Sequence, residues 1–187
     1  MCDIILENRL AVQFRFQEVI TVDSVKRLAR AGVFAALICL TTAYILHIPL
    51  AGGGYIHPGD AFVYLAACLL PWPYAFGAAA IGGAAADLLT APMWAPWTFV
   101  IKGLCVLAFS RRSQTLLRPR NLLACALGAV INLGGYFIAT WALLGERPSL
   151  LAYLPGELIQ AGASVVLFVI LALVIDRAGL RKLFEPM

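Results

Sequence analysis

Long apolar segments alternate with short polar or proline-rich connectors along most of this chain. From residue 25 onward the pattern contains six apolar segments that we predict to be helices, at residues 25–47, 61–70, 74–89, 97–109, 122–144 and 151–175. A helix needs about 20 apolar residues to cross the ~30 Å hydrocarbon core of a bilayer, so the second segment is too short to cross alone. The pattern predicts an all-α integral membrane protein, a bundle of six transmembrane helices.

The composition excludes an ordinary soluble domain. Hydrophobic residues make up 62% of the 187 residues, charged residues only 13%, and the mean hydropathy is +0.89. A soluble domain has about a quarter of its residues charged. Between residues 31 and 110 the formally charged side chains are Asp60, Asp87 and Lys102. A chain this short cannot bury several wholly apolar helices in a soluble core, so lipid must solvate most of its surface.

Ten of the 14 basic residues fall into three groups, each beside the end of an apolar segment. These groups are Lys26, Arg27 and Arg30; Arg111, Arg112, Arg118 and Arg120; and Arg177, Arg181 and Lys182. With six crossings all three groups face the cytoplasm, as the positive-inside rule requires, and both termini are cytoplasmic. The net charge of +4 is therefore no evidence for a nucleic-acid partner, and the grouping of the basic residues indicates the membrane orientation.

We divide the chain into three parts. Residues 1–24 mix charged and apolar side chains without the apolar core of a cleavable signal, and we expect an interfacial or disordered extension. Residues 25–176 form the six-helix membrane domain, and residues 177–187 form a basic cytoplasmic tail.

Small residues mark one face of the first predicted helix. Ala31, Ala35, Cys39 and Ala43 recur every four residues, which places them on one side of a helix. Small faces allow helices to approach closely in lipid. The face serves either packing inside the bundle or docking of another membrane subunit.

Two ionisable residues lie at membrane depth in neighbouring segments. Asp87 ends the third segment and Lys102 lies about one turn into the fourth. Charged groups at this depth usually have a partner, so we expect a structural Asp87–Lys102 ion pair, with a direct ligand role as the alternative. No metal site is expected, because His47, His57 and the five cysteines lack ligand spacing.

Polar and aromatic side chains gather toward the predicted outer side. Asp60 is either a helix cap or a binding residue, and the two tryptophans near the fourth segment either anchor it at the interface or stack on a flat ligand. Polar residues inside later helices should point inward. The candidate substrate-binding residues are Tyr55, His57, Asp60, Tyr64, Trp94, Trp97, Asn132, Tyr136, Glu157 and Gln160.

Three stretches carry a family resemblance: residues 54–64 (GYIHPGDAFVY), 80–89 (AIGGAAADLL) and 95–103 (APWTFVIKG). With these stretches the chain resembles the substrate-binding (S) components of energy-coupling factor (ECF) transporters. It is most similar to the riboflavin-transporter-like branch, and the resemblance covers residues 25–176.

The resemblance implies a function in the plasma membrane of a prokaryote. S components capture a vitamin or precursor outside the cell, and then associate with a membrane coupling subunit and two cytoplasmic ATPases. Ala31 and Ala35 match the Ala-x-x-x-Ala pattern that contacts the coupling subunit. The ligand would lie under the connector between the first two helices. Riboflavin, pyridoxine-type and pyrimidine-type compounds all fit, and neither a cofactor nor catalysis is expected.

Two other functions remain as alternatives. A stand-alone facilitator would move a small solute without ATPase partners. The chain has no P-loop, and a facilitator needs none. A small membrane enzyme is disfavoured, because Asp60, Asp87 and Glu157 form no compact motif and Ser164 lies far from both histidines in the sequence.

Overall fold

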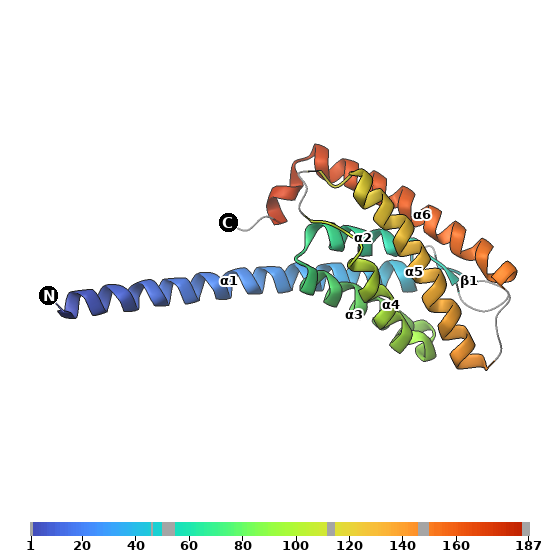
Figure 1. Ribbon diagram of the computed structural model, residues 1–187, viewed down its shortest axis with the longest axis horizontal. Coiled ribbons are helices and arrows are strands. Elements are labelled where there is room, and N and C mark those ends of the chain that lie inside the picture. Colours follow the sequence, from blue (N-terminus) through green and yellow to red (C-terminus); the bar gives the residue numbers. More distant parts are fainter. Residues whose placement is uncertain (1, 46, 50–54, 112–114, 146–149, 185–187) are drawn as a thin grey trace.

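A computed structural model describes residues 2–45, 47–49, 55–111, 115–145 and 150–184, with side chains described from residue 22 onward except at 49, 55 and 150–153. This part of the chain contains six α-helices, which confirms the predicted number of helices (Figure 1). They are α1 (Cys2–Ala43), α2 (Asp60–Leu69), α3 (Trp72–Thr90), α4 (Ala95–Val106), α5 (Pro119–Leu144) and α6 (Leu150–Arg177). Two 3₁₀ turns, η1 (Pro92–Trp94) and η2 (Leu180–Phe184), precede α4 and follow α6.

Proline and glycine set several helix boundaries. Pro71 precedes α3 in an extended conformation, and Pro119 is the first residue of α5. Proline is tolerated in a first helical turn because the N–H it lacks would have no partner there. Gly145 follows α5 with a φ of 70°, the left-handed conformation that glycine adopts without steric cost.

The first helix and the connector after it differ from the predicted pattern. α1 begins at Cys2 and extends beyond the bundle, whereas the apolar segment begins at residue 25 (Figure 1). In the connector, β1 (Ile48–Pro49) pairs antiparallel with β2 (Tyr55–Ile56), with Ile48 opposite Ile56. The apolar pattern contains no signal for strands of two residues.

The short helix α2 lies inside the bundle. Nine of its ten residues are buried, and it contacts α1, α3, α4 and α6. A helix enclosed by protein on all sides need not match the thickness of the bilayer, which explains how a ten-residue apolar helix fits a membrane fold.

The small face of α1 packs on α3. Ala31 is buried, and a Cβ atom added to Gly82 of α3 would lie 2.6 Å from the carbonyl oxygen of Ala35. Ala31 and Ala35 thus lie on the side of α1 that packs against α3, and their role as a docking face for another subunit stays a prediction. Gly32, one position further round the helix, has open space on its side: no atom lies within 4 Å of where an added Cβ would be.

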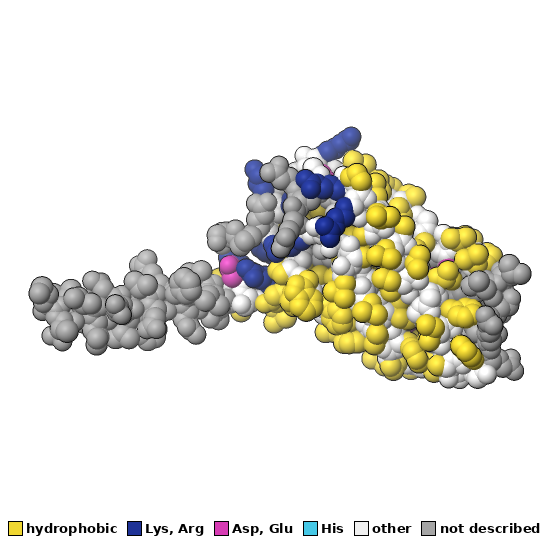
Figure 2. Space-filling model, in the orientation of Figure 1, with side chains coloured by type: hydrophobic (Ala, Val, Ile, Leu, Met, Phe, Trp, Pro, Cys, Tyr) yellow, Lys and Arg dark blue, Asp and Glu magenta, His cyan; other side chains and the backbone are white. Residues whose placement is uncertain are grey.

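Most of the remaining surface is apolar. α5 and the Leu154–Arg177 part of α6 are long and apolar enough to cross a membrane, with mean hydropathies of 1.9 and 2.7. Figure 2 shows apolar side chains over the bundle and Lys and Arg side chains gathered at one end of it. Lipid-facing walls with basic residues at one end are typical of a membrane protein.

Candidate functional site

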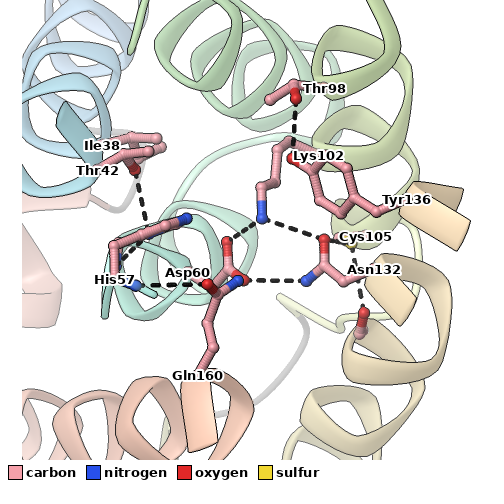
Figure 3. Close-up of polar contacts among 12 residues, drawn as sticks. Ile38, Thr42, His57, Asp60, Thr98, Lys102, Cys105, Asn132, Tyr136 and Gln160 are labelled. Atoms are coloured by element: carbon pink, nitrogen blue, oxygen red, sulfur yellow. Dashed lines mark hydrogen bonds and ion pairs between the residues drawn. The ribbon is translucent and has the colours of Figure 1, made fainter. Parts of the chain in front are cut away.

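A buried polar network joins three helices near the first turn of α2. The Lys102 ammonium of α4 donates to Asp60 Oδ1 at 2.6 Å and to Asn132 Oδ1 at 3.1 Å (Figure 3). Asn132 Nδ2 of α5 donates to the other carboxylate oxygen of Asp60 at 2.9 Å. The three residues are at most 3% exposed. Each carboxylate oxygen thus has its own donor, the condition under which a buried ion pair is tolerated.

Lys102 forms its ion pair with Asp60 and not with the expected Asp87. The turn η1 folds α4 back along α3, so that Lys102 packs opposite Gly83, about one turn before Asp87. Because glycine has no side chain, Lys102 extends past α3 toward α2. The alternative of Asp60 as a helix cap also fails, since Gly59 occupies the N-cap position and no side-chain cap bond is formed.

The connector before α2 extends the network to α1 and α6. The backbone N–H of His57 donates to Gln160 Oε1 at 3.3 Å, and the N–H of Gly59 donates to His57 Nδ1 at 3.0 Å. Thr42 Oγ1 of α1 lies 3.4 Å from the same ring nitrogen. These contacts hold the connector against the bundle, next to Asp60.

His57 is held as a neutral ring. Burial in the connector lowers its pKa to about 3, although the Asp60 carboxylate favours the protonated form. Because Nδ1 accepts the Gly59 N–H, the single ring proton is on Nε2.

We expect this neutral histidine to make the protein less stable in acid. The unfolded chain takes up a proton below pH 6.5 and the folded chain does not, so stability is complete above that pH and falls toward pH 3. The free energy of unfolding should fall by about 2 kcal/mol between pH 7 and pH 5. His57→Asn keeps an acceptor near Nδ1 and removes the titration. Melting curves in detergent should show a shallower pH dependence for this variant, and an unchanged slope would contradict the assignment.

An aromatic pair borders the network. The Lys102 ammonium lies 5.4 Å from the ring centroid of Tyr136, whose hydroxyl is 2.8 Å from Thr98 Oγ1. The centroid of the Trp94 ring, in η1, lies 6.2 Å from that of the Tyr136 ring, and the planes of the two rings make an angle of 62°. A cation and aromatic rings in contact offer a flat ligand both polar and stacking partners.

The structure brings together most of the candidate residues proposed from the sequence. His57, Asp60, Asn132 and Gln160 belong to the hydrogen-bonded network, and Trp94 and Tyr136 lie beside it.

Three other candidates do not join the hydrogen-bonded network, and the side chain of a fourth is not described. Tyr64 is fully buried and stacks on Phe109 at 5.0 Å, one turn deeper in the core. Trp97 and Glu157 are half-buried, and no hydrogen bond joins them to the network within the described residues. The side chain of Tyr55 lies outside the described residues.

Three residues of the site had not been singled out from the sequence. Thr42, Thr98 and Cys105 contact the network or its aromatic border, with Cys105 Sγ 3.7 Å from Asn132 Oδ1. Residues 98, 102 and 105 share one face of α4, so a search for a polar stripe around Lys102 would have found two of them. Among the described residues no cluster of three or more His, Cys, Asp or Glu side chains could hold a metal ion.

Comparison with protein families decides the class of this protein. Residues 22–177 match the family described as "ECF-type riboflavin transporter, S component". The chain belongs to this family. It is thus a membrane transport protein and not an enzyme, as the resemblance in its sequence predicted. The S component is also 29% identical over 130 residues to a Pyrococcus woesei protein described as "Uncharacterized protein in gap 3'region", covering 67% of this chain and 86% of that protein.

Proposed function

We propose that this S component captures riboflavin, or a close neutral relative, at the Asp60–Lys102–Asn132 network for ATP-driven uptake. The observation that carries the proposal is the ion pair itself. The carboxylate and the ammonium neutralise each other, so a charged ligand would gain no net attraction from the site. A neutral ligand would find a few convergent polar groups beside aromatic rings, as in many small-molecule sites.

The chemistry of the border suits a flat heteroaromatic ring. The isoalloxazine ring of riboflavin has carbonyl and ring-nitrogen acceptors and one N–H donor on one edge. The amides of Asn132 and Gln160 supply both donors and acceptors, and Trp94 and Tyr136 supply ring faces. We place the ligand between this border and the connector that carries His57, on the outer side of the bundle.

The orientation follows from charge. All three basic groups would lie in the cytoplasm if the six helices form six crossings with both termini inside. The network, at the opposite end of α2 from the basic residues, would then face outward. The partners would be a coupling subunit and two cytoplasmic ATPases, which supply the energy of uptake.

We also propose a docking face for the coupling subunit. Gly32 and Ala36 are exposed one turn apart on α1, flanked by the exposed side chains of Val33 and Leu40. A strip of small residues lets a partner helix approach closely in lipid. This face lies beside the Ala31 and Ala35 pair that the sequence indicated.

Riboflavin binding to the purified chain tests the proposed ligand. We expect the fluorescence of riboflavin to be quenched on binding, because the ring would contact Trp94 and Tyr136. Trp94→Ala should weaken binding about tenfold, the scale of an aromatic contact with its buried area. Trp72→Ala is the matched control, because Trp72 is 67% exposed near the basic end. Binding of pyridoxine or a pyrimidine in place of riboflavin would overturn the assignment of the ligand.

A further inference from the structure

A pocket lies at the opposite end of α2 from the polar network, among the basic residues. It has a volume of about 680 Å³ and is lined by the end of α2, the start of α3, the segment after α4, the start of α5 and η2. η2 is fixed against α1, because the Phe184 ring lies 6.2 Å from Phe34 and under the guanidinium of Arg30 at 5.6 Å. The pocket therefore has walls from five parts of the chain.

Three arginines line this pocket, and two of them are held by backbone carbonyls. Arg181 Nη2 donates to the carbonyl of Arg111 at 2.9 Å, and Arg111 Nη2 donates to the carbonyl of Phe184 at 3.1 Å. These bonds fix the positions of the two guanidinium groups, and the carbonyl that holds Arg181 has no net charge to offset that of its guanidinium. The third, Arg120, is exposed at the rim.

The guanidinium of Arg181 includes a buried donor atom. Its Nη1 atom is inaccessible to solvent and has no hydrogen-bond partner in the described part of the chain. The carboxylate of Asp176, close to this end of α6, accepts the backbone N–H of Leu116 at 2.9 Å. The ion pairs among the described residues are Arg27–Asp23 and Lys102–Asp60, so neither Arg181 nor Arg120 has a carboxylate partner there. A buried guanidinium N–H without an acceptor is costly, so a turn of the Arg181 guanidinium toward an anion in the pocket would be favourable.

The rest of the pocket is apolar. Leu69, Trp72, Phe109 and Phe184 line it, and Trp72 is largely exposed beside Pro71. A phosphate group suits the arginines, because guanidinium groups bind its oxygens in pairs. The apolar walls suit the hydrocarbon attached to such a phosphate. In a membrane protein the basic end lies at the level of the cytoplasmic headgroups, where basic pockets between helices bind anionic lipids.

We propose that this pocket binds the phosphate headgroup of an anionic phospholipid from the cytoplasmic leaflet. The site is separate from the vitamin site, and it does not depend on the identity of the vitamin.

Native mass spectrometry of the full chain in neutral detergent tests the proposal. The protein is titrated with phosphatidylglycerol, with phosphatidylcholine of the same acyl chains, and with inorganic phosphate. We expect phosphatidylglycerol to bind at least fivefold more tightly than phosphatidylcholine, and Arg120→Gln to weaken it about fivefold, the effect of one cation near a lipid surface. Arg181→Gln should have a larger effect, because it also removes the buried donor.

Arg118→Gln is the matched control, since Arg118 is exposed at the start of α5 and does not line the pocket. An equal loss in Arg118→Gln would show a general attraction to positive charge and overturn the proposal. Inorganic phosphate that displaces the lipid at similar concentration would identify a free-phosphate site and overturn the lipid assignment. Because Arg120 is exposed, its variant should fold normally even if Arg181→Gln does not.

Discussion

Replacing Lys102 by methionine is expected to abolish vitamin binding and to lower the free energy of unfolding by about 3–5 kcal/mol. Methionine roughly keeps the length of the side chain and removes its charge. Asp60, which is 2% exposed, would then keep the Asn132 amide as a donor but lose its positive partner. The measurements are a melting curve in detergent and a riboflavin titration.

A double variant distinguishes the effect of an unpaired buried charge from the effect of a changed side-chain shape. The double variant Asp60→Asn with Lys102→Met removes both charges, so most of the lost stability should return while binding stays weak. Lys182→Met is the control for the substitution itself, because Lys182 is exposed on η2. A Lys102→Met protein as stable as the wild type would show that the buried pair contributes nothing.

Replacing Gly32 and Ala36 together by leucine is expected to stop vitamin uptake and to leave riboflavin binding unchanged. Both residues are exposed on α1, and Gly32 has nothing within 4 Å of the position of an added Cβ, so the larger side chains should not disturb the bundle. They would prevent close approach of the coupling subunit. Uptake is measured in vesicles that contain the coupling subunit and the ATPases, and binding on the isolated chain.

Two further variants show whether the effect belongs to this face. Gly162→Leu changes an exposed glycine of α6 that also has open space around it, and uptake should continue. Ala31→Leu changes a buried residue, and both stability and binding should fall. Normal uptake by the Gly32 and Ala36 variant would place the docking face elsewhere. Uptake by vesicles without the ATPases would favour a facilitator.

The apolar pattern was sufficient to predict six helices, because polar or proline-rich connectors separate the apolar segments, including the short one that forms the buried helix α2. It was not sufficient to find the partner of Lys102. That pairing depends on the turn at η1 and on the absence of a side chain at Gly83, which together direct the lysine toward α2. Asp87 is closer to Lys102 in the sequence and was therefore the expected partner. The path of the backbone brings Lys102 to Asp60 instead.

The small residues of α1 show the same limit. Ala31 and Gly32 are neighbours in the sequence, about 100° apart around the helix. Ala31 shares a face of the helix with Ala35, and Gly32 shares a neighbouring face with Ala36. Periodicity cannot tell which of these two pairs faces α3. The close approach at Gly82 decides that question, and it belongs to the packing of two helices. Tyr64 was similarly grouped with Asp60 by spacing, although it packs on Phe109 in the core.

The open space around certain glycines has a practical consequence for spectroscopy. Gly134 on α5 and Gly162 on α6 are exposed with no atom near an added Cβ, so each can become a cysteine that carries a fluorophore or spin label. Of the native thiols in the described residues, Cys68, Cys105 and Cys125 are buried and should react slowly. Labels on α5 and α6 would therefore report the tilt of the S component in a bilayer as it captures and releases its vitamin.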